Sequence, residues 1–179
     1  MCPMIWTAWY NPTVKPVIVV PYDPLWPVQF EALADRIKSH CGLLLITIHH
    51  VGSTAVPGLW AKPILDIDLE ILPEMFELVK AQLAALGYTH EGNLGIEGRE
   101  AFKTSSSDLP KHHLYVCPTT SHELKRHLAF RNALRQNDDL RDTYSRIKQE
   151  AAHHHPMDIN AYIEEKGIWI ATIYARLGV

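Results

Sequence analysis

The sequence has few of the features that mark secreted, membrane-spanning or nucleic-acid-coating proteins. Its three cysteines, at positions 2, 41 and 117, have no CxxC spacing, which argues against a disulfide framework and favours a reducing compartment. No apolar run reaches the roughly 20 residues that a membrane helix needs. A net charge of -3 gives no overall field to attract nucleic acid or an anionic membrane. These absences predict a cytoplasmic protein with no membrane partner, and they argue against nucleic acid as a partner.

The Walker phosphate loop is also missing, because Gly58 is followed by Leu59 rather than by lysine and a hydroxyl residue. The composition is ordinary for a globular chain of 179 residues, with 47% hydrophobic and 21% charged residues. We expect a loose aromatic leader over 1–16 and one domain over 17–179. Within it, a sheet core should extend to about residue 120 and a helical part should follow over 121–179.

The first half of the chain has the pattern of alternating helices and strands. Residues 17–20 are a short β-branched run, and Asp23-Pro24 favours a helix from there to about residue 40. The apolar run 43–51 predicts a strand that ends in a tight turn at Gly52-Ser53. Residues 64–71, with the sequence ILDIDLEI, alternate between an acidic and an apolar face, which predicts a second strand.

The second half predicts more sheet and then helices only. Residues 73–86 have helical spacing, 88–103 suggest a hairpin, and 113–117 suggest a further strand. From residue 121 the periodicity is helical, and Asp158 is placed to cap a helix over 159–177. The expected fold is therefore α+β, with a mixed sheet flanked by helices and a helical annex at the carboxyl end.

Asp66 and Asp68 are the strongest candidates for a chemical role. On a strand they project to one side about 6.6 Å apart, so that their carboxylates can hold one Mg²⁺ (or Mn²⁺) ion, or two ions, as in phosphoryl transfer. A bare DxD pattern is more often a solvated strand face. The preceding Gly52-Ser53 turn changes that balance, because its amides and hydroxyl can cradle phosphate oxygens. Together, the two motifs predict a nucleotide site.

The block HVGSTAVPGLWAKPILDIDLEI resembles the signature of the nucleotidyltransferase superfamily and, more narrowly, of the GrpB family. The resemblance continues through YDPLWPVQFEAL upstream and through GRE, HHLYV and FRNALR downstream. It implies a mixed sheet with flanking helices and, by analogy with the superfamily, metal-dependent transfer of a nucleotidyl group from a nucleoside triphosphate to an unknown small-molecule acceptor. A related domain also occurs fused to dephospho-CoA kinase.

The sequence departs from the superfamily at the third carboxylate, which many members carry on a later strand. Here that strand is HHLYV, where His113 or Tyr115 stands in the corresponding place. His113 is a candidate third metal ligand or base, since histidine is a common metal ligand and proton acceptor. The alternative is that His113 only makes a structural hydrogen bond.

Several basic residues are candidates for binding phosphate oxygens, and surface solvation is the alternative for each. They are Lys62, Arg99, Lys103, Arg131 and Lys148. His127 with Arg131, Tyr144 with Lys148, and Tyr162 with Lys166 are each four residues apart, so that each pair shares a helix face. These pairs either line the far wall of the cleft or take part in helix packing, with the lysines extending to solvent.

Two other acidic or histidine features are expected to be solvated. Glu70 lies too far along its strand to share a site with Asp66, and the run His153–His155 sits at a helix end with no partner spacing for a metal.

Two other functions remain open. Without a full set of carboxylates the chain could be a binding module for a nucleotide or a CoA-like ligand. It could also be an interaction scaffold that uses Trp6, Trp9 and Tyr10 of the leader as an anchor.

Overall fold

The fold is built on a five-stranded mixed sheet with strand order β1-β2-β5-β4-β3. The computed structural model describes residues 15–179, so that Trp6, Trp9 and Tyr10 lie outside the described residues. The strands are β1 Thr47–Val51, β2 Leu65–Ile71, β3 Tyr88–Gly92, β4 Glu100–Thr104 and β5 His112–Pro118. The central pair, β2 and β5, is parallel, and every other pair is antiparallel. The predicted α+β class and the predicted hairpin, β3 with β4, are confirmed.

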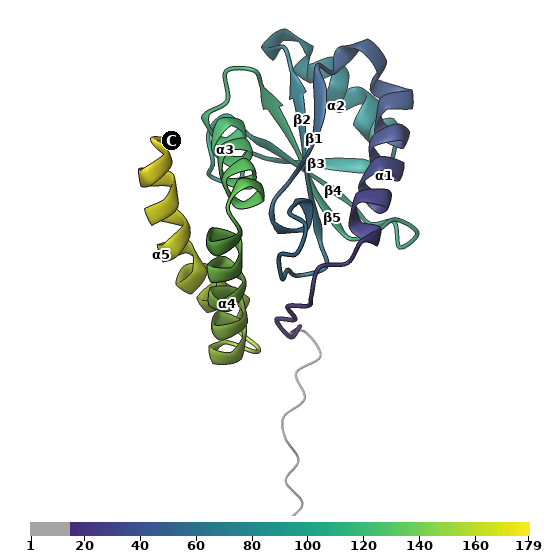
Figure 1. Cartoon of the computed structure of the whole chain (residues 1–179). Helices are drawn as coiled ribbons and strands as arrows, with labels where there is room; N and C mark the ends of the chain where they lie inside the picture. The colour runs from purple at the N-terminus through teal and green to yellow at the C-terminus, as the bar shows by residue number, and fades with distance from the viewer. Residues whose placement is uncertain (1–14) are drawn as a thin grey trace, which may run out of the picture.

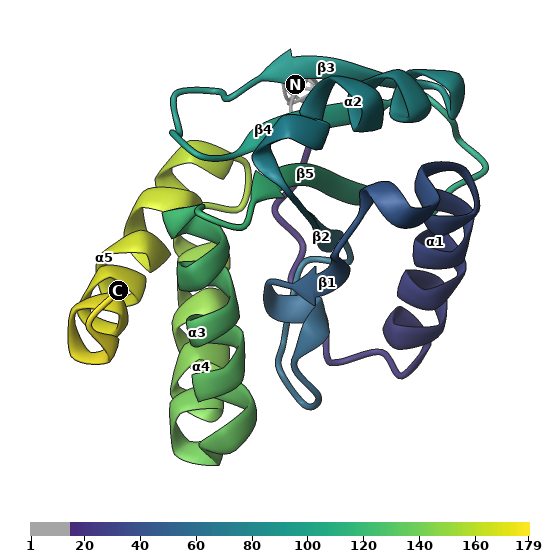
Figure 2. The same ribbon diagram turned by 90° about the horizontal axis from the view of Figure 1, so that it is seen from above.

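Helices cover both faces of this sheet (Figures 1 and 2). On one side lie α1 (Leu25–Cys41) and α2 (Phe76–Ala85). On the other side lie α3 (His122–Gln136), α4 (Asp138–His154) and α5 (Ile159–Leu177), which form the predicted carboxyl-terminal annex. Asp158 caps α5 as predicted, since its side chain accepts hydrogen bonds from the amides of Asn160 and Ala161.

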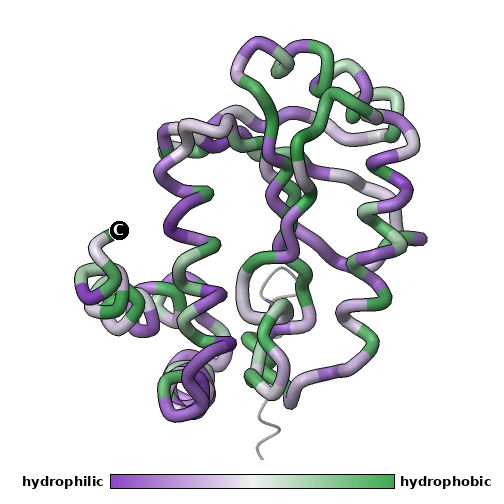
Figure 3. The backbone as a smooth tube through the Cα atoms, turned by 45° about the horizontal axis from the view of Figure 1, so that its top comes forward, coloured by the Kyte–Doolittle hydropathy of each residue, from purple (hydrophilic) through white to green (hydrophobic). Residues whose placement is uncertain are grey.

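The two largest of three apolar clusters hold the layers together. The apolar side of β2, Leu65 to Ile71, packs against α1 and α2 and forms the main core. The second cluster joins the loop after β1, through Val56 and Leu59, to Phe130, Tyr144 and their neighbours on the annex. Figure 3 shows green hydrophobic positions recurring along the helices, as this packing requires. The acidic side of β2 therefore faces the annex.

The predicted strand over 43–51 is too long, because β1 begins only at Thr47. Gly42, with φ 51°, ends α1, and Gly42–Leu44 form a 3-10 turn that exposes the apolar Leu43. The β-branched run 17–20 contributes only one bridge, from Val20 to Ala61.

Residues 73–75 are likewise a 3-10 turn that precedes α2. Within residues 15–179 no helix is both long and apolar enough to cross a membrane.

Candidate functional site

The Gly52-Ser53 turn is built directly against the carboxylate of Asp66. Val51 and Asp66 are opposite each other in the antiparallel β1–β2 pair, and the chain leaves β1 through Gly52 with φ 68°. A Cβ atom at Gly52 would lie only 2.8 Å from the Asp66 carboxyl carbon. Glycine is therefore required at position 52 for two reasons: the backbone there is left-handed, and the Asp66 carboxylate leaves no room for a Cβ atom.

Gly52→Ala is expected to lower the free energy of unfolding by about 2–4 kcal/mol, because backbone strain adds to a steric clash with Asp66. Urea denaturation measures the loss. Gly87→Ala is the matched control, since Gly87 also has a positive φ of 87° but has open space where its Cβ would be. Equal losses in the two variants would mean that the approach to Asp66 is not tight.

Asp66 is joined to His113 across the parallel strands β2 and β5. The two residues are register partners, and His113 Nδ1 lies 2.9 Å from Asp66 Oδ1. Both side chains reach solvent, with 31% of the Asp66 side chain and 52% of the His113 side chain exposed. A carboxylate and an imidazole in contact at an open edge can bind a cation or exchange a proton with a ligand.

Asp68 lies deeper and is completely buried. His127 on α3 approaches it, with His127 Nδ1 2.7 Å from Asp68 Oδ2. Burial lowers the pKa of His127, but the hydrogen bond and the charge of Asp68 outweigh it, so that the pKa is raised. The other oxygen, Asp68 Oδ1, has no hydrogen-bond partner among the described residues.

Tyr115 occupies the β5 position opposite Asp68. The Arg99 guanidinium stacks on the Tyr115 ring, 4.1 Å from its centre, and Arg99 Nε is buried without a partner in the described part of the chain. Burial raises the pKa of Tyr115 to about 12, so the phenol stays neutral. The two β5 positions beside the aspartates thus carry His113 and Tyr115 in place of a carboxylate.

Lys148 of α4 is the most unusual basic residue. It is only 1% exposed, its Nζ has no hydrogen-bond partner among residues 15–179, and it lies 4.5 Å from the centre of the Tyr144 ring. Burial, reinforced by the charge of Lys166, lowers the pKa of Lys148 to about 6, although Asp66 acts in the opposite direction. The alternative interpretation, in which the Lys148 side chain extends to solvent, is therefore wrong.

Further cations and hydroxyls surround Lys148. Burial raises the pKa of the Tyr144 hydroxyl, and a side-chain hydrogen bond with Ser53 opposes that shift. Two lysines lie near the Tyr162 ring, with Lys62 Nζ 6.0 Å and Lys166 Nζ 5.6 Å from its centre. Burial lowers the pKa of Lys62, and the positive charge of Lys166 lowers it further. Lys148 and Lys166 of the annex and Lys62 of the loop before β2 are therefore on the side of the sheet that carries Ser53 and Asp66.

Two of the predicted basic residues are engaged elsewhere. Arg131 donates to the His50 carbonyl at 3.0 Å and also bonds Asn132, so that it ties α3 to the end of β1. Lys103 is on β4, beyond β5, and lies 3.9 Å from Glu91 with most of its side chain exposed.

The expectation that Glu70 and the histidine run are simply solvated is wrong in part. Glu70 lies 2.8 Å from His49, and both side chains are partly buried. His154 and His155 contact Glu165 at 3.0 and 2.8 Å, whereas His153 has no ion pair within residues 15–179 and lies beside the His154 ring.

Sequence reasoning missed the contact between His127 and Asp68. The spacing of His127 and Arg131 placed both on one helix face, but nothing in the pattern named the strand residue that this face meets. A polar stripe on α3 opposite the acidic side of the predicted strand was the available signal.

The two aspartates fit a magnesium ion in part. Carboxylate oxygens are the hard ligands that Mg²⁺ prefers, and Asp68 Oδ1, which has no hydrogen-bond partner among the described residues, is available as a metal ligand. Within residues 15–179 no group of three or more His, Cys, Asp or Glu side chains is placed to hold a metal. The chain itself would thus supply one or two ligands, a number typical of magnesium sites completed by water and substrate phosphate.

With this geometry in view, comparison with known proteins identifies the family. The family model described as GrpB protein matches residues 16–176. The chain belongs to the GrpB family. A GrpB relative, the UPF0157 protein YqkA of Bacillus subtilis, is 35% identical over 159 residues, which are 88% of this chain and 46% of YqkA. The chain thus spans about half the length of that relative.

A second relative has a different description. The dephospho-CoA kinase of Mycolicibacterium paratuberculosis is 29% identical over 188 residues, which are 90% of this chain and 46% of the kinase.

Solved structures confirm the fold. The crystal structure of GrpB from Enterococcus faecalis matches with a TM-score of 0.80 at 33% identity, covering 89% of this chain and 96% of that chain. Cid1 in complex with its short product ApU matches with a TM-score of 0.52 at 9% identity, covering 73% of this chain and 42% of Cid1. The GrpB chain therefore has a mixed-sheet fold that it shares, distantly, with Cid1.

Proposed function

We propose that this GrpB protein is a metal-dependent nucleotidyltransferase that binds a nucleoside triphosphate between β2 and the annex. The observation that carries the proposal is the buried Lys148, whose amine has no partner among the described residues and lies within electrostatic range of Asp66. Burying a polar group without a hydrogen-bond partner lowers the stability of the fold by about 1–3 kcal/mol. A ligand that binds the group best explains why such a lysine is present. An anionic ligand beside Lys148, Lys62 and Lys166 would offset that cost.

The nucleotide's phosphates would lie between the Gly52-Ser53 turn and these lysines. Gly52 leaves the backbone accessible, and the Ser53 hydroxyl and turn amides are donors of the kind that bind phosphate oxygens. Asp66 and Asp68 would hold Mg²⁺, which when bound would neutralise phosphate charge and align the phosphates. Mn²⁺ has similar ligand preferences and would serve in its place.

In the reaction that we propose, an acceptor hydroxyl attacks the α-phosphorus in line. A bond forms between the acceptor oxygen and the α-phosphorus, and the bond from that phosphorus to the bridging oxygen of the β-phosphate breaks. Pyrophosphate leaves with that electron pair. His113, oriented by its contact with Asp66, would take the acceptor proton, and the lysines would stabilise the charge of the leaving pyrophosphate.

Two relatives support this assignment, although neither establishes it. Cid1, which shares the fold, has been crystallised with its product ApU and with the UTP analogue UMPNPP, so the shared sheet is compatible with nucleotide binding in that protein. The relative from Mycolicibacterium paratuberculosis is described as a dephospho-CoA kinase, and this chain spans less than half of its length.

Calorimetric titration with each of the four ribonucleoside triphosphates, with and without Mg²⁺, tests the binding step. We expect at least one to bind only with Mg²⁺, and we expect Asp66→Asn to lose that binding. Glu74→Gln is the control, because Glu74 lies in the exposed turn before α2, away from the site. If no triphosphate bound under any condition, the nucleotide assignment would be wrong.

One observation favours a second function, a non-catalytic nucleotide-binding or CoA-like-ligand-binding module. Asp68 is fully buried and engaged by His127, and β5 supplies no third carboxylate. A module of this kind would bind its ligand with equal affinity with and without Mg²⁺ and would release no pyrophosphate.

A further inference from the structure

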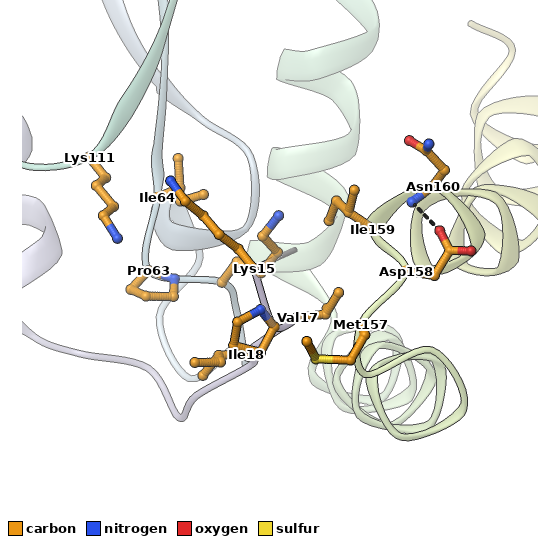
Figure 4. A pocket seen from close by; sticks show the side chains of 12 residues that line it. Lys15, Val17, Ile18, Pro63, Ile64, Lys111, Met157, Asp158, Ile159 and Asn160 are labelled. Carbon is orange, nitrogen blue, oxygen red and sulfur yellow. Dashed lines mark hydrogen bonds between the residues drawn. The ribbon is translucent and has the colours of Figure 1, made fainter. Parts of the chain in front are cut away.

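A groove rich in lysine opens beside the proposed nucleotide site. We call it the lysine groove; it has a volume of about 690 Å³, and its lining includes Lys15, Lys62, Lys111, Ile64, Met157 and Ile159. Figure 4 shows Lys111 and Ile64 on one side and the α4–α5 junction, Met157 to Asn160, on the other, with Lys15 between them. The groove thus combines an apolar lining with three ammonium groups.

These lysines have no acidic partner in the part of the chain that the structure describes. The ion pairs found there include none of Lys15, Lys62 and Lys111. Residues 1–14 contain no Asp or Glu, so the remaining chain offers none either. The one carboxylate that lines the groove, Asp158, is used to cap α5. Three positive charges are therefore available for a ligand.

The apolar lining is equally unusual for a groove at the surface. Ile18, Met157 and Ile159 all line it and are all exposed large hydrophobic residues. A purely ionic ligand such as inorganic phosphate would leave this surface in water. The lining is complementary to a molecule that has both an anionic group and an apolar body.

The position of the groove connects it to Asp66 and His113. Ile64 and Lys111 each lie two residues before one of this pair, directly ahead of the parallel strands β2 and β5, and the Leu65 amide donates to the Lys111 carbonyl at 3.0 Å. Two residues of strand span roughly 6.6 Å. A second cavity of about 850 Å³ shares Lys15, Ile64 and Lys111 and continues to His113. A ligand in the groove can therefore extend to the proposed base.

We propose that the lysine groove is the acceptor site and that the acceptor is a phosphate monoester with an apolar body. This assignment rests on the proposed transferase function. Three compact ammonium groups suit a doubly charged phosphate better than a single carboxylate, and the apolar lining holds the body of the acceptor while its hydroxyl reaches His113. Lys62, which lies beside both the groove and Tyr162, marks the border with the triphosphate site.

1-Naphthyl phosphate is a probe with these two features, and its binding to the full-length protein is measured by calorimetry. We expect it to bind more tightly than 1-naphthol, 1-naphthoate and inorganic phosphate, by about tenfold or more in each case. Lys111→Ser and Ile159→Ser should each weaken binding about tenfold, whereas Lys125→Ser, at an exposed α3 position outside the groove, should leave it unchanged. Thermal unfolding checks that each variant is folded.

The same titration, repeated with a saturating Mg²⁺–nucleoside triphosphate, separates this proposal from the transferase proposal. Naphthyl phosphate should still bind. Displacement by the triphosphate, or equal affinity in Lys111→Ser and wild type, would overturn the acceptor site even if the nucleotide binds as expected. Binding that is detected only after Trp6 and Trp9 are both replaced by serine would assign the groove to the chain's own leader and would also overturn it. Loss of triphosphate binding alone would instead count against the transferase function.

Discussion

Lys148→Met is expected to stabilise the protein while weakening its binding of triphosphate. The ordinary lysine pKa is 10.5, and burial lowers it to about 6 in the folded protein. Between these values the unfolded chain binds more protons than the folded chain, so stability rises with pH by about 1.4 kcal/mol per unit. The loss of folding free energy caused by burying Lys148 is therefore greatest at low pH, and it disappears above the lysine pKa of the unfolded state.

Urea unfolding of wild type and Lys148→Met, at about pH 6.5 and about pH 9, measures this effect. The variant should be the more stable at the lower pH, and its advantage should shrink by about 3 kcal/mol at the higher pH. Lys125→Met, at an exposed position on α3, is the control and should show no such change. A difference between variant and wild type that does not depend on pH would mean that Lys148 is charged in the folded protein.

The same variant should lose affinity for the Mg²⁺–triphosphate by about 10–100-fold, since a charge-assisted hydrogen bond contributes about 1.5–3 kcal/mol. Unchanged affinity in a folded Lys148→Met protein would mean that Lys148 does not bind the triphosphate, which would contradict the proposed function.

Asp66→Asn is expected to reduce nucleotidyl transfer by at least about 10³-fold, which corresponds to about 4 kcal/mol of transition-state stabilisation. Asparagine keeps the size of the side chain but lacks the charge that would hold the metal and orient His113. His113→Gln should cost less, about 10²-fold, because it removes only the proton acceptor. Glu74→Gln should have no effect. If Asp66→Asn kept its transfer activity, the Asp66 carboxylate would not be needed for the reaction.

Much of the fold could be predicted because local pattern and tertiary environment agree. In residues 64–71 the alternation is complete, and the structure places the apolar side on the main core and Asp66 and Asp68 on the other side. Gly52 follows a run of strand formers, and the turn lies where this pattern puts it. The strand over 43–51 was predicted too long because Leu43 to Leu45 have the composition of a strand. In the structure Gly42 begins a 3-10 turn, so the residues directly after it are not part of the strand.

The far side of the site could be predicted only in part. Helical spacing put Tyr144 and Lys148 on one face of a helix, but it could not tell a buried lysine from an exposed one, because that depends on how α4 packs against the loop after β1. For the same reason Arg131, although on the right helix, was assigned to phosphate without any sign that the His50 carbonyl would engage it. Pairings between distant segments have no signature in a single sequence.

Nucleotidyl transfer by this protein can be followed with a nucleoside triphosphate labelled at the α-phosphate, once with Mg²⁺ and once with EDTA in its place. Water can serve as a slow acceptor when no other is known. We expect Mg²⁺-dependent release of pyrophosphate, with the label in the nucleoside monophosphate or in an acceptor conjugate. Release of inorganic phosphate with the label in the diphosphate, or binding of the triphosphate without any conversion, would contradict it.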